Sequence, residues 1–351
     1  MTQYFVYVQA LVTSFLLTLI VSPFVISLLK REKIKQTILH YVDNHASKNG
    51  TPTMGGIIFL VSISIVAYIF FTGEKTLAGV SLLVFMAYGL TGFLDDFIKF
   101  RFKRNLGLRA YQKILFQLAI AITIAIFAYK NQFVGGKMLV PFSNKTIDVG
   151  WWIIPIIVFV FLACTNSVNL TDGLDGLASS TTMCYTMGMV ALMFFMMATR
   201  LDSASSLYLA EYKNLIILGF VVIGAMLCFL VFNCFPAKIF MGDTGSLALG
   251  AFVACIAIFS RMTLYIPILG FMFVLSALSV IIQVAYYKMT KKRVFLMAPL
   301  HHHFEKKGVH EVRISVVYSV ITILIGAGSL LLEMLWCRGA FAQRSKVWKQ
   351  L

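Results

Sequence analysis

The stretch LAGVSLLVFMAYGLTGFLDD (residues 77–96) joins a run of uncharged, mostly apolar residues to two adjacent aspartates. A helix needs roughly 20 mainly apolar residues to cross the hydrocarbon core of a bilayer. An ionised carboxylate at the edge of such a run is costly and seldom accidental. The stretch therefore predicts a membrane span with a functional acidic group at one end.

The whole chain is too apolar for an ordinary soluble domain. It has 351 residues, of which 60% are hydrophobic and 13% are charged, and its mean hydropathy is +0.87. This composition predicts an all-α, polytopic integral membrane protein that forms one domain over residues 1–351. Ten segments are expected to be spans, at about residues 4–29, 55–72, 77–94, 111–130, 151–168, 177–199, 213–232, 244–260, 264–288 and 313–336.

Lysine and arginine predict how the spans are oriented. With ten spans, the loops that follow the odd-numbered spans share one side and hold 19 of the 30 Lys and Arg residues. The positive-inside rule places these loops in the cytoplasm and both termini outside, although the basic C-terminal tail argues mildly against this. The basic loops have two open interpretations, topology and anionic-lipid contact on one hand and substrate binding on the other. A nucleic-acid partner is not expected.

Groups suited to catalysis concentrate on this predicted cytoplasmic side. All six histidines fall in these loops, and five of the fourteen acidic residues lie at the edges of long apolar runs on the same side. A transporter usually places its carboxylates near the middle of its spans, where the substrate is held. The one-sided distribution instead favours a site that faces cytosolic solutes. The five acidic residues are Asp95, Asp96, Asp172, Asp175 and Asp243.

The pair Asp95-Asp96 closes the third expected span. An acidic residue at a helix C-terminus meets the negative end of the helix dipole, so capping does not account for the pair. Neighbouring carboxylates also repel each other unless a cation lies between or beside them. Because adjacent helical residues point about 100° apart, we expect one carboxylate to face a metal ion while the other orients a nucleophile.

A loop with two Asp-Gly steps, NLTDGLDGL at residues 169–177, follows the fifth expected span. The two steps indicate turns. Asp175 has two open interpretations, as the N-cap of the next helix and as a functional group. The loop presents an amide, a hydroxyl and two carboxylates near a helix N-terminus, a combination that suits phosphate, a metal ion or sugar hydroxyls.

A third motif, NCFPAKIFMGDTGS at residues 233–246, opens the eighth expected span. Asp243 is interpreted either as an N-cap or as a Mg²⁺ ligand. Phe240 is interpreted either as an anchor at the membrane interface or as a stacking face for a base. Glycines on both sides of Asp243 would let a bulky phosphate approach the backbone.

The fourth motif is APLHHHFE, at residues 298–305. Consecutive imidazoles point in different directions, unlike the i, i+4 pair of a zinc helix, so zinc is disfavoured. His302 and Glu305 can share a helix face at i, i+3, which leaves a histidine to contact or position a diphosphate. A polar surface turn remains the alternative interpretation.

Hard carboxylate ligands and phosphate-friendly loops together indicate Mg²⁺ bound jointly with a substrate phosphate. Phosphoryl transfer needs charge neutralisation and positioning more than covalent machinery from the protein. Cytosolic loops combined with membrane spans then predict one soluble and one lipid substrate.

Five motifs occur together and in order: residues 50–56 (GTPTMGG), 95–96, 169–177, 233–246 and 299–305. The chain thereby closely resembles the phospho-N-acetylmuramoyl-pentapeptide-transferase family, the bacterial translocase I of peptidoglycan synthesis. That family belongs to the polyprenyl-phosphate N-acetylhexosamine-1-phosphate transferase superfamily. The resemblance covers essentially the whole chain apart from the last dozen residues.

The resemblance implies an activity, partners and a location. The family transfers phospho-N-acetylmuramoyl-pentapeptide from UDP-N-acetylmuramoyl-pentapeptide to undecaprenyl phosphate, which gives lipid I and UMP and requires Mg²⁺. We therefore expect a multi-pass protein of the bacterial cytoplasmic (inner) membrane, embedded in the lipid bilayer. A homodimer, a groove between spans for the polyprenyl tail and inhibition by nucleoside antibiotics are also expected.

The resemblance also implies roles for single residues. Asp243 is expected to bind Mg²⁺, the Asp95/Asp96 pair to handle the lipid phosphate, and His302 to lie close to the diphosphate. Asp95, Asp96 and Asp175 are further candidates for metal ligands. The residues expected to bind substrate are Lys48, Thr53, Asn169, Asp172, Asn233 and Phe240 in the nucleoside pocket, Lys113 at a phosphate, and Asp175, His301 and His303.

Two mechanisms and two other functions stay open. In a one-step reaction, Asp95 or Asp96 deprotonates undecaprenyl phosphate, which attacks the diphosphate. In a two-step reaction, an aspartate attacks first and forms an acyl phosphate; the one-step version is favoured because an oriented phosphate monoester is already an adequate nucleophile. The alternatives in function are a UDP-N-acetylglucosamine-1-phosphate transferase and a cation-coupled transporter.

Overall fold

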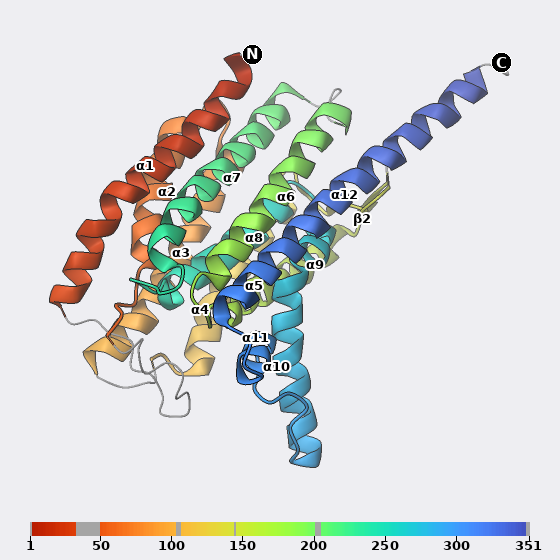
Figure 1. Ribbon diagram of the computed structural model, residues 1–351. Helices are drawn as coiled ribbons and strands as arrows, with labels where there is room; N and C mark the ends of the chain where they lie inside the picture. The colour runs from red at the N-terminus through yellow and green to blue at the C-terminus, as the bar shows by residue number, and fades with distance from the viewer. Residues whose placement is uncertain (1, 33–49, 103–106, 144, 201–204, 349–351) are drawn as a thin grey trace.

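The computed structural model describes residues 2–32, 50–102, 107–143, 145–200 and 205–348, and within this part the chain is a bundle of helices beside one small hairpin (Figure 1). The helices are α1 (Thr2–Arg31), α2 (Gly56–Phe70), α3 (Thr76–Arg101), α4 (Ala110–Lys130), α5 (Ile153–Thr171), α6 (Leu177–Arg200), α7 (Ser206–Asn233), α8 (Gly242–Phe259), α9 (Ile266–Leu269), α10 (Phe271–Thr290), α11 (Leu300–Lys306) and α12 (Glu311–Trp348). Two short 3-10 helices are η2 (Gly150–Trp152) and η3 (Thr263–Tyr265). The hairpin pairs β1 (Lys137–Leu139) antiparallel with β2 (Thr146–Asp148).

Nine helices among the described residues are long and apolar enough to cross a membrane, and the chain is an integral membrane protein. The expected span at 55–72 is helical only over Gly56–Phe70, which is 15 residues. At about 1.5 Å per residue this helix is roughly 22 Å long, shorter than the ~30 Å hydrocarbon core. The expectation of ten spans is therefore met by nine full-length helices and one short apolar helix.

The expected start of the span at 264–288 is wrong, because the chain is broken before the long helix begins. Thr263–Tyr265 and Ile266–Leu269 form two short helices, and α10 starts only after Gly270. Pro267 has no backbone N–H to donate and suits only the first turn of a helix. After the break, α10 runs away from the other helices and projects beyond the bundle (Figure 1).

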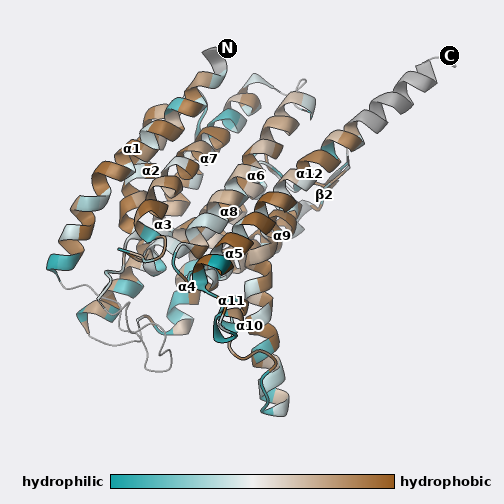
Figure 2. Ribbon diagram, viewed as in Figure 1, coloured by the Kyte–Doolittle hydropathy of each residue, from teal (hydrophilic) through white to brown (hydrophobic). Residues whose placement is uncertain are grey.

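The two ends of the bundle differ in polarity. The start of α1 and the end of α12 lie at one end, and α11 lies at the other, where α3 also ends (Figure 1). Hydrophilic residues gather at this second end and at the tip of α10 (Figure 2). We call the second end the site end, because all the residues of the candidate site lie there.

Helix α8 lies at the centre and packs against α3 and α5. From Thr244 to Phe259 it is buried on every side, which requires a helix that is apolar all round. The outward faces of the surrounding helices carry large exposed apolar residues, such as Phe24, Leu83 and Phe159. This distribution fits a bundle whose outer surface contacts lipid.

Two buried carboxylates far from the site end have structural partners. Glu211 accepts hydrogen bonds from the backbone N–H groups of Thr76 (2.9 Å) and Leu77 (2.8 Å), which begin α3. Glu333 pairs with Arg200 at 2.5 Å. These contacts cap one helix and join α6 to α12, so neither carboxylate is counted among the catalytic candidates.

Candidate active site

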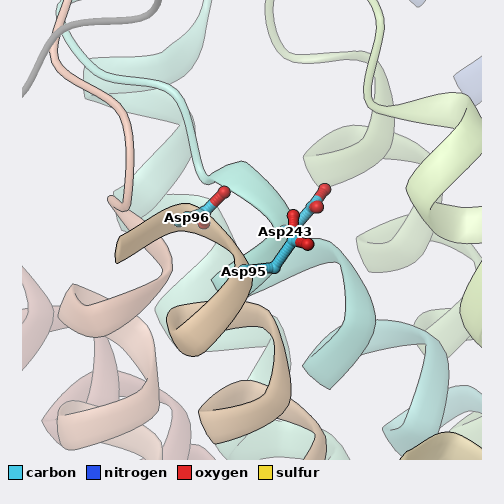
Figure 3. Close-up of side chains that lie close together, drawn as sticks. All are labelled: Asp95, Asp96 and Asp243. Atoms are coloured by element: carbon cyan, nitrogen blue, oxygen red, sulfur yellow. The ribbon is translucent and has the colours of Figure 1, made fainter. Parts of the chain in front are cut away.

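Three carboxylates meet where α3 ends and α8 begins. Asp95 and Asp96 come from α3 and Asp243 from the first turn of α8, and the Asp95 side chain points toward Asp243 (Figure 3). One oxygen from each lies within 4.8 Å of the others. We call Asp95, Asp96 and Asp243 the carboxylate group. Hard oxygen donors gathered this closely could hold a metal ion.

Asp96 caps a helix, although not its own. Its Oδ2 accepts hydrogen bonds from the backbone N–H of Thr244 at 2.9 Å and from the Thr244 hydroxyl at 2.7 Å. The first N–H groups of a helix have no partner within it, and an oxygen acceptor there stabilises the helix. Asp96 is therefore held at the N-terminus of α8, where the helix dipole favours a negative charge.

Both carboxylate oxygens of Asp243 contact other side chains. Its Oδ2 lies 2.8 Å from the ammonium nitrogens of Lys99 and Lys113. Its Oδ1 accepts a hydrogen bond of 2.7 Å from the amide of Asn169, which also donates to Ser246 at 2.8 Å. Asp243 follows the N-cap residue Met241 by two positions, so it is not itself the cap that one interpretation expected.

Asp95 is bonded within its own helix and to the loop that follows. It pairs with Lys99 at 2.6 Å, and its Oδ1 accepts a hydrogen bond from the Leu108 N–H at 2.8 Å. Sequence reasoning did not name Lys99 as a site residue. The signal was present, because Lys99 follows Asp95 by four positions and α3 continues to Arg101, past the expected end at residue 94.

Close contact between α3 and α8 brings the carboxylates together. A Cβ placed on Gly92 would lie 2.0 Å from the carbonyl oxygen of Asp243. Any side chain at this position would push the two helices apart. Gly92 therefore sets the distance between the aspartates of α3 and the aspartate of α8.

The loop after α5 carries Asp172 and Asp175, which have different surroundings. Asp172 is half-buried, and burial raises its pKa well above the usual range, with the carboxylates of Asp243 and Asp96 adding to the rise. Asp175 is buried and accepts a hydrogen bond from the Ala237 N–H at 2.9 Å. Asp175 does not belong to the carboxylate group. Its expected role as a metal ligand therefore gains no support from the grouping of the carboxylates.

The histidine motif forms the short helix α11 and packs against this loop. A Cβ on Gly173 would lie 2.4 Å from His301 Nε2 and 2.8 Å from His302 Nε2, so both rings contact the loop backbone. The expected pairing of His302 with Glu305 is confirmed, with 2.8 Å between Nδ1 and the carboxylate. That contact leaves Nε2 of His302 on the side of the Gly173 loop.

The other two histidines are held differently. His301 is fully buried, and neither ring nitrogen has a hydrogen-bond partner in the described part of the chain. Burial, together with the neighbouring His302, lowers the pKa of His301 to about 3. His303 accepts a hydrogen bond at Nδ1 from the Leu296 N–H at 3.1 Å. His301 is thus a neutral packing group at neutral pH.

Of the residues expected in a nucleoside pocket, Phe240 and Thr53 lie in or beside the 50–56 motif. Phe240 lies beside the 50–56 motif, since its N–H donates to Pro52 at 2.9 Å and its carbonyl accepts from Gly55 at 2.8 Å. Thr53 also lies in this motif, and its hydroxyl oxygen would be 2.9 Å from a Cβ on Gly242.

Asn233 and Lys48 complete that expected set. Asn233 is buried, accepts a hydrogen bond from the Ser179 hydroxyl (2.6 Å) and donates to the Ile239 carbonyl (2.9 Å). Its amide therefore shapes the 234–240 loop. Lys48 lies outside the described residues.

Comparison with known proteins relates this geometry to a family. A family model described as glycosyl transferase family 4 matches residues 77–261, and a phospho-N-acetylmuramoyl-pentapeptide-transferase signature matches residues 48–60. The phospho-N-acetylmuramoyl-pentapeptide-transferase of Clostridioides difficile strain 630 is 42% identical over 313 residues, which covers 89% of this chain and 93% of the relative. The chain belongs to the phospho-N-acetylmuramoyl-pentapeptide-transferase family.

Other members of the phospho-N-acetylmuramoyl-pentapeptide-transferase family give the same picture. The Clostridium novyi strain NT protein is 40% identical over 319 residues, covering 91% of this chain and 94% of the relative. The Clostridium perfringens strain 13 protein is 41% identical over 320 residues, covering 90% and 95%. The chain is thus a phospho-sugar transferase, and the region 77–261 that matches glycosyl transferase family 4 contains the whole carboxylate group.

Proposed function

We propose that this protein transfers phospho-N-acetylmuramoyl-pentapeptide from UDP-N-acetylmuramoyl-pentapeptide to undecaprenyl phosphate with Mg²⁺, giving lipid I and UMP. The observation that carries the proposal is the carboxylate group with Lys99 and Lys113 against it, at one end of a bundle of apolar helices. Such a site can serve a charged soluble donor and a lipid acceptor together. The names of the relatives supply the transferred group, phospho-N-acetylmuramoyl-pentapeptide.

The carboxylate group fits Mg²⁺. Three carboxylates offer oxygens within 4.8 Å of one another, and hard oxygen ligands suit this ion. In the proposal, Asp243 and Asp95 hold the ion, because Asp96 Oδ2 already accepts two hydrogen bonds from Thr244. When bound, Mg²⁺ neutralises charge on the diphosphate and makes its phosphorus easier to attack.

The lysines and His302 bind the donor diphosphate in this proposal. Lys99 and Lys113 place two positive charges on the same oxygen of Asp243, and phosphate oxygens can take the place of that carboxylate oxygen as their partner. His302 is oriented by Glu305, so its Nε2 is fixed on the side of the Gly173 loop. Asn169 keeps Asp243 in position through Oδ1.

The proposed reaction is a single displacement. An oxygen of undecaprenyl phosphate attacks the phosphorus that bears the sugar, and the bond from that phosphorus to UMP breaks. Asp95 or Asp96 accepts any proton that the lipid phosphate carries. The sugar C–O bond is untouched, so the anomeric configuration is retained. Positioning and electrostatic stabilisation supply the rate enhancement.

The remaining assignments follow from the same proposal. Phe240 stacks on uracil, with Lys48, Thr53, Asp172 and Asn233 in the nucleoside region. The site end faces the cytoplasm of a bacterium, both termini lie outside, and the whole chain acts as one domain of the cytoplasmic membrane. A homodimer and inhibition by nucleoside antibiotics belong to this proposal too.

Purified protein incubated with both substrates and Mg²⁺ tests the proposal. We expect UMP release and lipid I formation, both abolished by a chelator and restored by added Mg²⁺. UDP-N-acetylglucosamine serves as the competing donor. Activity with that donor and none with the muramoyl-pentapeptide donor would overturn the assignment.

An isotope-exchange assay tests the number of steps. Labelled UMP is incubated with UDP-N-acetylmuramoyl-pentapeptide, Mg²⁺ and enzyme, without undecaprenyl phosphate. A single displacement predicts no label in the nucleotide sugar. Incorporation of label would demonstrate a covalent enzyme intermediate and rule out the one-step reaction.

A further inference from the structure

Deeper in the bundle than the carboxylate group, a second set of polar side chains joins α3, α4 and α5. The set consists of Tyr88 on α3, Gln117 on α4 and Asn166 on α5, and we call it the three-helix tie. Tyr88 and Gln117 are both fully buried. Polar groups between membrane helices are expensive to bury, so their presence needs an explanation.

Hydrogen bonds connect the three members across the helices. The Tyr88 hydroxyl donates to the backbone carbonyl of Gln117 at 2.9 Å. The Asn166 amide donates to Gln117 Oε1 at 2.9 Å and to the Leu162 carbonyl of its own helix at 2.8 Å. The Tyr88 ring also stacks on Phe161 of α5, with 5.8 Å between centroids and 9° between planes.

On α4 and α5, the residue that belongs to the tie lies on the same helix face as a residue of the candidate site, and the site residue is nearer the site end. Lys113 precedes Gln117 by four positions, and Asn169 follows Asn166 by three. Residues three or four apart lie on one helix face, about one turn from each other. The Gln117–Asn166 bond therefore lies one turn below Lys113 and Asn169, which contact opposite oxygens of Asp243.

Stability alone does not account for Gln117. Its Nε2 is buried and has no hydrogen-bond partner among the described residues. An unsatisfied buried donor is costly, and hydrogen bonds between membrane helices contribute modestly on average. An apolar side chain of similar size would pack without that cost. The Gln117 amide is instead explained by its oxygen, which accepts the hydrogen bond from Asn166 and so sets the spacing between α4 and α5.

We infer that Gln117 and Asn166 are positioning residues for the reaction: their hydrogen bond fixes α4 against α5 so that Lys113 and Asn169 hold Asp243 from both sides. Neither residue touches substrate in this inference. Both act through Asp243, whose orientation sets the geometry of the metal-binding carboxylates. The inference rests on the proposed Mg²⁺-dependent transfer and extends it to residues one turn deeper.

The test compares the full-length protein with Gln117→Leu and Asn166→Leu. Binding of Mn²⁺, used in place of Mg²⁺, is followed without substrates by the loss of the free-ion signal in electron paramagnetic resonance. Changing residues that orient metal ligands typically costs ~10–100-fold in affinity or activity. For this more distant pair we expect a rise in the Mn²⁺ dissociation constant of about 3–10-fold and a similar fall in kcat. The KM for the nucleotide sugar should change less than kcat does.

Thr165→Val is the matched control. Thr165 is buried beside Asn166 on α5, and its hydroxyl donates to Phe161 at 2.7 Å within the same helix. The control removes a buried hydrogen bond without breaking a link between helices. It should leave Mn²⁺ binding unchanged. Gln117→Leu should stay close to the wild type in melting temperature, because removal of the unpaired donor offsets the loss of the bond from Asn166.

Two further variants test whether the pair acts as a unit. The double variant Gln117→Leu/Asn166→Leu should be no worse than the poorer single variant, because contacting residues are not additive when one bond carries the effect. The exchanged pair Gln117→Asn/Asn166→Gln keeps both amides and should recover at least half of the lost Mn²⁺ affinity.

The outcomes separate this inference from the proposed function. If the wild-type protein binds no Mn²⁺, the proposed metal site fails. If the wild type binds Mn²⁺ and Gln117→Leu behaves like Thr165→Val in affinity and kcat, the positioning role is refuted while the proposed function stands. A lower melting temperature with unchanged Mn²⁺ affinity would likewise assign the tie to stability and refute positioning.

Discussion

Oδ2 of Asp96 accepts two hydrogen bonds from Thr244, one from its backbone N–H at 2.9 Å and one from its hydroxyl at 2.7 Å. The adjacent Asp95 makes a different set of contacts, with Lys99 and the Leu108 N–H. The two neighbouring aspartates thus have different hydrogen-bond partners. Asp96 fixes the start of α8, whereas Asp95 is held by Lys99 and by the loop after α3.

Replacing Asp96 should therefore affect stability as well as activity. We expect Asp96→Ala to lose about 1–2 kcal/mol of stability, since the N-terminus of α8 loses its cap. Asp96→Asn keeps an acceptor oxygen and should melt closer to the wild type. Scanning fluorimetry of both variants, with UMP release as the activity readout, provides the comparison. Equal melting temperatures for Asp96→Ala and the wild type would show that the cap is unimportant.

Lys99 should be essential for turnover. Its ammonium contacts Asp95 at 2.6 Å and Asp243 at 2.8 Å, so Lys99→Met leaves clustered carboxylates without one of their two cations. Loss of a positioned charge of this kind typically lowers kcat by roughly 10²–10³. Arg101→Met, at the exposed end of the same helix, is the control and should keep most activity. Similar kcat values for the two variants would exclude a catalytic role for Lys99.

Gly173→Ala should separate the loop after α5 from the short helix α11. The added methyl group would lie 2.4 Å from His301 Nε2 and 2.8 Å from His302 Nε2, which is closer than atoms can pack. We expect UMP release to fall by about tenfold or more, as happens when catalytic groups are displaced by about 1 Å. Gly79→Ala is the matched control, because no atom lies within 4 Å of its added methyl group. Wild-type activity in Gly173→Ala would contradict the contact.

His301 should make the folded protein sensitive to mild acid. Its pKa is lowered to about 3 in the folded state from an ordinary value of 6.5, so between these values the unfolded chain binds more protons. Stability is then greatest above pH 6.5 and falls as the pH drops toward 3. From pH 7 to pH 5 the loss from this residue is about 2 kcal/mol.

Melting temperatures measured at several pH values test this titration. His301→Gln should lose less stability between pH 7 and pH 5 than the wild type does. His310→Gln is the control, because His310 is exposed and lies just beyond α11. If His301→Gln and the wild type lose stability in parallel, the buried imidazole does not govern the acid response.

Local spacing was enough to predict part of this structure. Apolar runs indicated most of the long helices, because burial in lipid depends on composition along one segment. The His302–Glu305 contact followed from i, i+3 spacing in a single turn. Lys99 could have been found in the same way, had α3 been extended past residue 94.

Contacts between distant segments could not be predicted in this way. Asn169 was expected near a nucleoside, but its amide bonds to Asp243 of α8, and no local pattern encodes that pairing. Asp243 was interpreted as a possible cap, whereas the group that caps α8 is Asp96, from another helix.

The bond from Thr244 to Asp96 joins positions 148 residues apart in the chain. During synthesis, a ribosome that has released α3 must still make four more membrane-crossing helices before α8 exists to receive the Asp96 carboxylate. Until then the aspartates of α3 have neither Asp243 nor the start of α8 as partners. The chain therefore assembles the carboxylate group late in its own insertion, and a chain that stops before α8 is a membrane protein without that group.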